Sequence, residues 1–576
     1  MPEETTKKYR KYFDIAFAAF FAAVTALYIR KVPYGFHFFD EANWLALSDR
    51  LMRGDALLYD DWTLTQIPLV ILYPLVRLYH AVFGGNEGII ITFRYIFVFF
   101  HCVNTIALYL MLRKKSPVAA LCAVMLYFPF SHLYIAALSY YTMALDFMLL
   151  ACAVLAVHGE KKIGMFAGGL LFALAVIEDP YLAALYAAYC IACVVCAALK
   201  KRPHPLLGGR GWLCFTCGCA VPAVIFAAFV LSRASVTELI GALPHLFGDE
   251  KHSVGGNGSK VWSFFTDMIE RTTVPEILLL VPAAAYLIDR GREKRKGLYA
   301  SALALFTVCA VLINFRSSMV GGMLTLSAKL TQPFAISGIS AYIMSEKKDG
   351  KTLCLMYLPG WAFALCMYLA SDTGYSVVNT PLMVCACAGA CFMCGMFSEL
   401  RSKPGASRAA KLIPAAIFAA AMLAQTGYEL YYVKNYCFSE PSGTSMMFST
   451  IDYGIGKGEK TTENTALYEQ DGLWEATAPV RDAPGDYVLY FSDDCWPYLE
   501  DSKKCASFAV WIQRKTADTE AERLLDYWEM FPEKKPDAIY VSKNMKNVED
   551  IIEKINTENF PVEENERGYV LIRPQE

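Results

Sequence analysis

The stretch that decides the fold is HFFDEANWLALSDRLMRGDALLYDDW, residues 37–62. It follows an apolar run at 13–32 that is long enough to cross a membrane as a helix. Two adjacent carboxylates, Asp40 and Glu41, stand where the chain leaves that run. An ionised carboxylate is costly to hold where water is partly excluded, so these two residues are expected to have a specific partner or role.

The rest of the sequence supports a membrane location. Hydrophobic residues make up 56% of the 576 residues, and the mean hydropathy is +0.33. Apolar runs of about 20 residues alternate with short basic loops, a pattern typical of a polytopic α-helical membrane protein. The formal net charge of -2 argues against nucleic acid as a partner, because binding a phosphate backbone calls for a basic surplus.

Hydropathy predicts thirteen spans, and the basic loops orient them with the N-terminus in the cytoplasm and the C-terminus outside. The expected spans are 13–32, 89–112, 117–136, 139–157, 163–179, 181–199, 212–231, 274–289, 298–314, 323–344, 352–370, 378–397 and 408–427. The apolar stretch 66–84 has to stay on the outer side, and we interpret it as a helix lying in the membrane interface. Residues 1–429 are therefore expected to form the membrane domain, with an outer loop at 33–88.

Residues 430–576 have a different composition, with dense charges and shorter apolar runs. Strands are predicted at 486–491, 537–541 and 569–573, and helices at 521–531 and 547–555. This pattern indicates a small extracytoplasmic α/β domain. Cys495 and Cys505 lie in it, either as a disulfide or as two free thiols.

The chain has nineteen cysteines, and most lie inside apolar runs. The motif CFTCGC at 214–219 fits either a metal site or small packing residues in a helix, and its apolar setting favours packing. No phosphate-binding loop, GxSxG or HExxH motif occurs in the chain.

Residues 37–95 resemble the first outer loop of GT-C glycosyltransferases of the protein-mannosyltransferase and aminoarabinose-transferase type, glycosyltransferase family 39. The similarity consists of an Asp-Glu pair, an Arg-Leu-x-x-Gly helix end, a Tyr-x-Asp segment, a proline that opens an interfacial helix and an arginine near the start of the next span. The matching residues are Asp40-Glu41, Arg50-Leu51 with Gly54, Tyr59-Asp60-Asp61, Pro68 and Arg94.

The resemblance implies a GT-C fold and transfer of a sugar from a polyprenyl-phosphate donor to an acceptor outside the membrane. It gives Asp40 the role of base or orienting carboxylate, with Glu41 beside it and Asp61 as the second acidic position of the loop. From spacing alone, Asp40 is equally well placed to cap the helix that follows it.

A lipid phosphate requires cations near the outer interface. Arg94, Arg233, Arg316 and Lys329 fall at outer positions in the predicted topology, and Arg50 belongs to the matched loop. Interfacial snorkelling is the alternative for each outer cation. Asp179 is a further substrate-binding candidate, with a plain helix-boundary Asp-Pro as its alternative.

No cofactor is expected, although a divalent metal stays open because some relatives hold one with an acid and an outer-loop histidine. His245 is the weak candidate for that histidine, but Gln66 stands where the acid would be.

Two other functions remain open: a flippase or transporter of lipid-linked glycans, and a glycolipid-binding protein without turnover. A coupled transporter usually has ionisable groups at mid-span, and the sequence shows no ladder of them. Short cytoplasmic loops suggest a bacterial plasma membrane, which would make undecaprenyl phosphate the carrier. The sugar, the acceptor and the oligomeric state are undetermined by the sequence.

Overall fold

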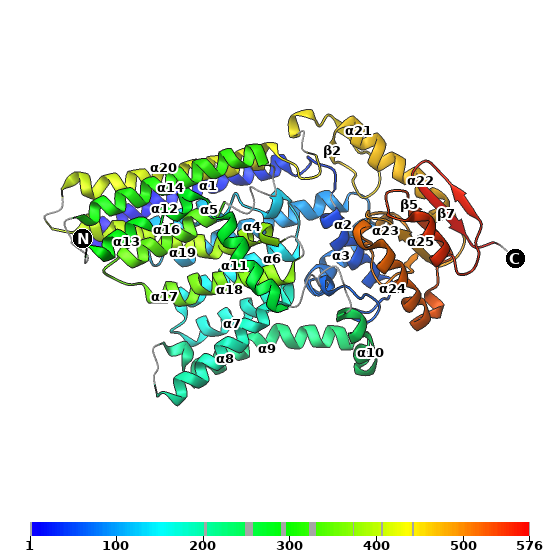
Figure 1. Cartoon of the computed structure of the whole chain (residues 1–576), viewed down its shortest axis with the longest axis horizontal. Helices are drawn as coiled ribbons and strands as arrows, with labels where there is room; N and C mark the ends of the chain where they lie inside the picture. Colours follow the sequence, from blue (N-terminus) through cyan, green and yellow to red (C-terminus); the bar gives the residue numbers. More distant parts are fainter. Residues whose placement is uncertain are drawn as a thin grey trace.

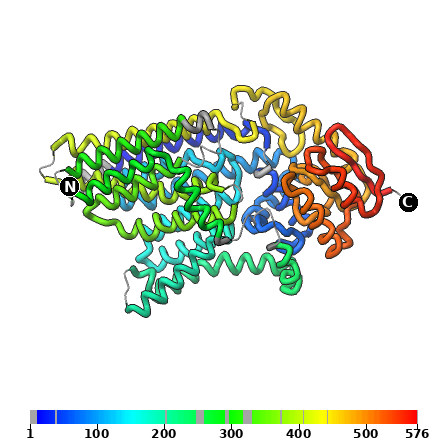
Figure 2. Tube along the Cα trace, viewed as in Figure 1, coloured from blue at the N-terminus to red at the C-terminus, as the bar shows by residue number. Residues whose placement is uncertain are grey.

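The computed structural model describes residues 3–37, 39–200, 204–247, 257–289, 295–321, 330–371, 374–404, 407–440 and 443–574. These residues form a long bundle of helices with a small sheet domain at one end (Figure 1). The N-terminus lies at the far end of the bundle and the C-terminus lies beyond the sheet (Figure 2). We call the end of the bundle next to the sheet the domain end.

Within these ranges, nine helical stretches are long and apolar enough to cross a membrane. They lie in α1 (Glu3–Lys31), α4 (Ile89–Leu112), α6 (Tyr140–His158), α8 (Ala183–Ala198), α9 (Gly209–Leu231), α14 (Lys296–Gly321), α18 (Leu358–Ala370) with the turns before it, α19 (Asn379–Ser402) and α20 (Arg408–Asn435). The pair Ser259–Arg271 and Val274–Ile288, bent by 92°, makes ten if it is one broken span. These helices indicate that the chain is a multi-pass membrane protein.

The predicted count of thirteen is not reached because three expected spans correspond to helices shorter than eighteen residues. These are α5 (Pro117–Tyr127), α7 (Lys162–Glu178) and α16 (Gln332–Met344). The predicted span 323–344 also includes residues outside the described ranges. The number of crossings therefore stays a prediction.

Residues 128–139 interrupt the bundle with irregular backbone, in which the only regular element is the short 3-10 helix η2 (His132–Tyr134). α5 ends at Tyr127 two residues before Pro129, and α6 begins after Ser139, whose side chain forms a capping box with Thr142. Backbone that is not helical at membrane depth has to be enclosed by protein, because its polar groups find no partners in lipid. The carbonyl of Phe128 meets this requirement by accepting hydrogen bonds from Tyr28 and His101.

Small residues allow the closest helix crossings. A Cβ atom added to Gly338 of α16 would lie 2.2 Å from the Cα atom of Gly389 in α19. α7 and α9 meet in the same way at Gly169 and Gly218, where a Cβ atom would lie 2.1 Å from a carbonyl oxygen. Such contacts are typical of helices that associate in membranes, where close backbone packing replaces the hydrophobic effect.

Two helices lie at the domain end between the bundle and the sheet (Figure 1). α2 (Phe39–Met52) already includes Asp40 in its first turn, so the N-cap interpretation of Asp40 is wrong by these bounds. The chain turns at Gly54, where φ is +110°. α3 (Leu69–Phe83) occupies most of the stretch predicted as an interfacial helix, and it exposes Leu78, Val82 and Phe83.

The C-terminal domain is built on a five-stranded sheet of order β4-β3-β5-β7-β6. Its strands are β3 (Tyr487–Phe491), β4 (Lys504–Cys505), β5 (Ala538–Ser542), β6 (Val562–Glu564) and β7 (Gly568–Ile572). β3 is parallel to β4 and β5, whereas β7 is antiparallel to β5 and β6. The three predicted strands are confirmed, as are the helices α24 (Ala517–Met530) and α25 (Val548–Ile555).

Cys495 and Cys505 are both buried and are not joined by a disulfide in the structure, so of the two alternatives that the sequence left open the disulfide is not formed. In α19, Cys385 and Cys387 are fully buried, and the Cys385 thiol donates to the carbonyl of Tyr357 at 3.1 Å. These two cysteines therefore pack the bundle, as their apolar setting predicted.

Candidate functional site

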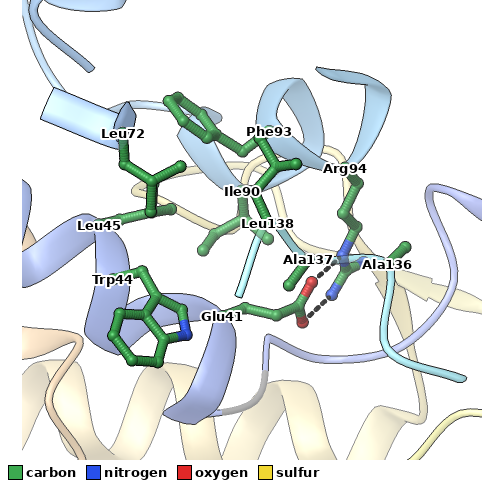
Figure 3. A pocket seen from close by; sticks show the side chains of 10 residues that line it. All are labelled: Glu41, Trp44, Leu45, Leu72, Ile90, Phe93, Arg94, Ala136, Ala137 and Leu138. Atoms are coloured by element: carbon green, nitrogen blue, oxygen red, sulfur yellow. Dashed lines mark hydrogen bonds and ion pairs between the residues drawn. The ribbon is translucent and has the colours of Figure 1, made fainter. Parts of the chain in front are cut away.

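A charge pair between α2 and α4 lies at the domain end. Arg94 donates from Nε to Oε1 of Glu41 at 2.7 Å and from Nη2 to Oε2 of Glu41 at 2.8 Å. The two side chains point toward each other in Figure 3, and both residues are buried. A bidentate arginine–carboxylate pair fixes orientation as well as distance, so it holds the first turn of α2 against α4.

The remaining donors of Arg94 are also used. Nη1 donates to the carbonyls of Val32 and Gly35, each at 3.1 Å, and Nη2 lies 3.4 Å from Oε1 of Glu459. Glu459 in turn accepts from the backbone and the Nδ1 atom of His37. Arg94 therefore joins the end of α1, the start of α2 and the C-terminal region. Four of its five N–H donors make hydrogen bonds, and Nη2 also lies at ion-pair distance from Glu459, so the guanidinium has little capacity left for a lipid phosphate.

A hollow of about 20 Å³ lies beside the pair. Its walls come from α2, α3, α4 and the non-helical segment between α5 and α6 (Figure 3). The lining residues include Trp44, Leu72, Phe93 and Leu138. This volume accommodates about one water molecule, whereas small-molecule sites usually measure about 300–1,000 Å³. A sugar therefore needs the walls to separate before it can enter.

Asp40 is placed by its backbone alone. It belongs to the first turn of α2, directly before Glu41, and its side chain lies outside the part that the structure describes. Its role as base or orienting carboxylate stays a prediction.

No known family model matches this sequence, and no curated protein is significantly similar to it.

The other matched residues of the loop form a second, buried cluster. Arg50 donates to Asp55 Oδ2 at 2.5 Å, to Asp61 Oδ2 at 3.0 Å and to the Tyr527 hydroxyl at 3.2 Å. Lys534 donates to Asp55 and to the neighbouring Asp60 at 2.8 and 2.7 Å. Tyr527 and Lys534 belong to the C-terminal domain, so these loop charges attach that domain to the loop.

Burial and the neighbouring cations act in opposite directions on the pKa values of these acids. It raises the pKa of Asp61 above the usual value, and the attraction of Arg50 offsets only part of that effect. Burial acts on Asp55 too, but Arg50 and Lys534 outweigh it and lower the pKa of Asp55. Asp61 accepts from the backbone and hydroxyl of Thr63 as well, so both of its carboxylate oxygens are hydrogen-bonded, and its catalytic role stays a prediction.

Gln66 and His245, the residues considered for a metal, have other contacts. Gln66 is fully buried, accepts from the backbone of Leu58 and donates to the carbonyls of Asp61 and Thr63. The His245 ring stacks on Trp62 with centroids 4.1 Å apart. Within the described ranges, no three His, Cys, Asp or Glu side chains are placed to hold a metal ion.

The remaining candidates are Asp179 and the cations predicted to lie on the outer side, and none of their described contacts is with Glu41 or Arg94. Arg233 donates to the carbonyls of Leu51 and Asp55 and to the Tyr73 hydroxyl, so it supports the end of α2. Arg316 is exposed near the end of α14, and Lys329 lies outside the described residues. Asp179 is buried and accepts from the backbone of Tyr181, while its Oδ2 atom has no hydrogen-bond partner.

Sequence reasoning missed His37 and Glu459, which complete the surroundings of Arg94. It also missed a polar group inside the bundle around Asp146. The Asp146 carboxylate accepts from Tyr127 and from Asn104, and it lies 3.9 Å from Nδ1 of His101. Histidine and asparagine at 101 and 104 of one predicted span were the available signal for this cluster.

Proposed function

We propose that this protein transfers a sugar from a polyprenyl-phosphate-linked donor to an acceptor, with inversion, at the domain end of its membrane bundle. The observation that supports it best is the bidentate Arg94–Glu41 pair, which fixes the turn of α2 that carries Asp40. Preorganised positioning of this kind is what a reacting carboxylate requires.

In this proposal Asp40 removes the proton of the acceptor hydroxyl or orients that hydroxyl for attack on C1 of the sugar. Glu41 and Arg94 are positioning residues. The polyprenyl phosphate leaves, and we assign its charge to Arg316 and Lys329, because four of the five N–H donors of Arg94 already make hydrogen bonds. The domain end would face the outside of a bacterial plasma membrane, with the N-terminus in the cytoplasm.

Sugar transfer in membranes from cells with and without the protein tests this proposal. A panel of radiolabelled polyprenyl-phosphate sugars would be supplied to wild-type, Asp40→Asn and Glu87→Gln chains. Glu87 is a suitable control because it is an exposed acid, 60% accessible, at the same end of the bundle. We expect label to leave one donor with the wild type and the control and to stay on it with Asp40→Asn.

Transfer by Asp40→Asn at the wild-type rate would remove Asp40 from the mechanism. The absence of transfer from every donor, with all three chains folded, would reject the proposal.

A transporter of lipid-linked glycans is the second candidate, and the buried group around Asp146 favours it. Ionisable side chains inside a membrane bundle often belong to proton or substrate pathways. This alternative predicts that a labelled lipid-linked glycan moves from one leaflet to the other in vesicles that contain the protein. The Asp146→Asn variant should stop this movement, and the Asp40→Asn variant should not.

A further inference from the structure

A cavity of about 250 Å³ lies at the domain end, where α1 and α20 finish. Its walls include three cationic side chains, Arg30, Lys31 and Lys434, together with the polar residues Asn435 and Thr444. It is much larger than the hollow beside Glu41 and shares no lining residue with it. A hollow of about 30 Å³ that includes Lys31 and Glu41 in its lining adjoins both, so the two features are distinct but neighbouring.

The cations of this cavity have little compensating charge. Lys31 donates to the carbonyl of Tyr436, and its Nζ atom lies 2.6 Å from the Cys437 sulfur. These two contacts use two of the three N–H groups of the Lys31 ammonium. Arg30 and Lys434 are exposed, and neither is paired with a carboxylate in the described part of the chain. Basic residues in a last helical turn complement the helix dipole, but this does not account for three of them around one cavity.

The cavity also opens where lipid would reach it. α1 and α20 are both long apolar helices that pack together, and their ends lie near the start of the C-terminal region (Figure 1). On the same two helices, Ile29, Leu423 and Tyr431 expose 50, 66 and 52% of their surface, with Leu423 about three turns before Lys434. An acyl chain could lie along these side chains while a charged headgroup enters the cavity.

We infer that this cavity binds a phosphate group, carried by an anionic phospholipid headgroup or present as free phosphate. Lysine and arginine are the usual partners of phosphate oxygens, and the volume leaves room for the anion with several waters. The site is independent of the proposed sugar transfer, because its residues take no part in that mechanism.

Lipid titration of the purified full-length chain tests the inference. Native mass spectrometry would count bound phosphatidylglycerol and phosphatidylcholine on the wild type and on Arg30→Gln/Lys434→Gln. We expect the wild type to retain one phosphatidylglycerol in preference to phosphatidylcholine. Each cation near a membrane surface contributes a similar free energy to the binding of an anionic lipid. Removing two of them should therefore weaken the binding of phosphatidylglycerol roughly 30-fold.

The matched control is Arg10→Gln/Arg408→Gln, which removes two exposed cations from the opposite ends of the same two helices. Its affinity should change less than about twofold, and equal weakening in both double variants would reject the cavity as the site. The charge-conserving variant Arg30→Lys/Lys434→Arg should retain binding, which separates loss of charge from loss of folding.

Inorganic phosphate distinguishes the two sources. Displacement of the bound lipid by millimolar phosphate in the wild type alone would support a site for the free anion. Persistence of the lipid would support the headgroup. Equal retention of the two lipids by the wild type, with no effect of phosphate, would overturn the inference.

Discussion

Lys534 and Asp60 are 474 residues apart in the sequence, yet Nζ of Lys534 lies 2.7 Å from Oδ1 of Asp60. The same ammonium reaches Asp55, and the guanidinium of Arg50 neutralises Asp55 from the other side. All four residues are buried. The loop after α2 and the C-terminal domain therefore share one buried network of charges. The loop supplies the carboxylates, and the C-terminal domain supplies the lysine that pairs with them.

Replacing Lys534 with methionine should loosen the C-terminal domain. The change leaves buried Asp60 without its cation and leaves Asp55 with Arg50 alone, and breaking such a buried pair costs about 3–5 kcal/mol. Thermal unfolding and limited proteolysis of the purified chain would measure the effect. Lys535→Met is the control, because Lys535 is 37% exposed and its pair with Glu558 is worth at most about 1 kcal/mol. Similar losses in both variants would contradict the network.

The pH dependence of stability should change with Asp494→Asn. Burial, aided by Glu469 and Asp493, raises the pKa of Asp494 to about 6. Because an aspartate in an unfolded chain titrates near about 3.9, the folded wild type holds more protons between pH 4 and 6 and loses stability as the pH rises through that window.

The asparagine variant lacks this loss. Between pH 4 and pH 7, its free energy of unfolding should therefore rise by about 1–2 kcal/mol relative to that of the wild type. This figure is reduced from the full shift because water reaches the partly buried side chain. Denaturation at several pH values gives the measurement, and the exposed Asp482→Asn serves as the control. A constant difference between Asp494→Asn and the wild type would show that this carboxylate titrates normally.

The α16–α19 crossing gives a steric prediction. Gly389→Val should prevent the normal contact, since even a Cβ atom at Gly389 would lie 2.1 Å from the Phe334 carbonyl oxygen. Overpacking usually costs about 1–3 kcal/mol, and a clash with backbone exceeds that range. The yield of folded protein in detergent would report it. Gly395→Val on the same helix is the control, because no atom lies within 4 Å of the added Cβ.

Arg94→Lys should destabilise the domain end even though the charge is conserved. A lysine cannot form the bidentate pair with Glu41 and also donate hydrogen bonds to the carbonyls of Val32 and Gly35. We expect a loss of about 2–4 kcal/mol in the free energy of unfolding. Arg77→Lys, an exposed site on α3, should have almost no effect in the same thermal unfolding experiment. A matching decrease in both variants would argue against the structural role of Arg94.

The sequence was sufficient for the helices and strands that depend on local pattern. Apolar runs marked α1, α4 and α20, because a helix is the economical way to satisfy backbone polar groups in lipid. The break after Tyr127 was missed although Pro129 and Ser139 signal it, because hydropathy stays high across residues 117–136. A hydropathy window records apolar content and not the direction of the backbone.

The candidate site was predictable only in its local part. Glu41 and Arg94 were both selected from the sequence, and the structure brings them together. The roles of Arg50 and Asp61 were obscured because their environment includes Lys534 and Tyr527, contributed by a distant domain. Glu459, separated from His37 by 422 residues, had no local signal at all. Long-range electrostatic partners depend on the fold and leave no spacing in the sequence.

The separation of Asp60 and Lys534 also has a consequence during synthesis of the chain. Translation at about 5–20 residues per second takes roughly 25 to 95 seconds to proceed from one residue to the other. Throughout that time the loop carries its acidic side chains without their lysine, so it depends on water or on a transient binding partner. The loop is therefore synthesised early but is among the last parts of the chain to reach its final form.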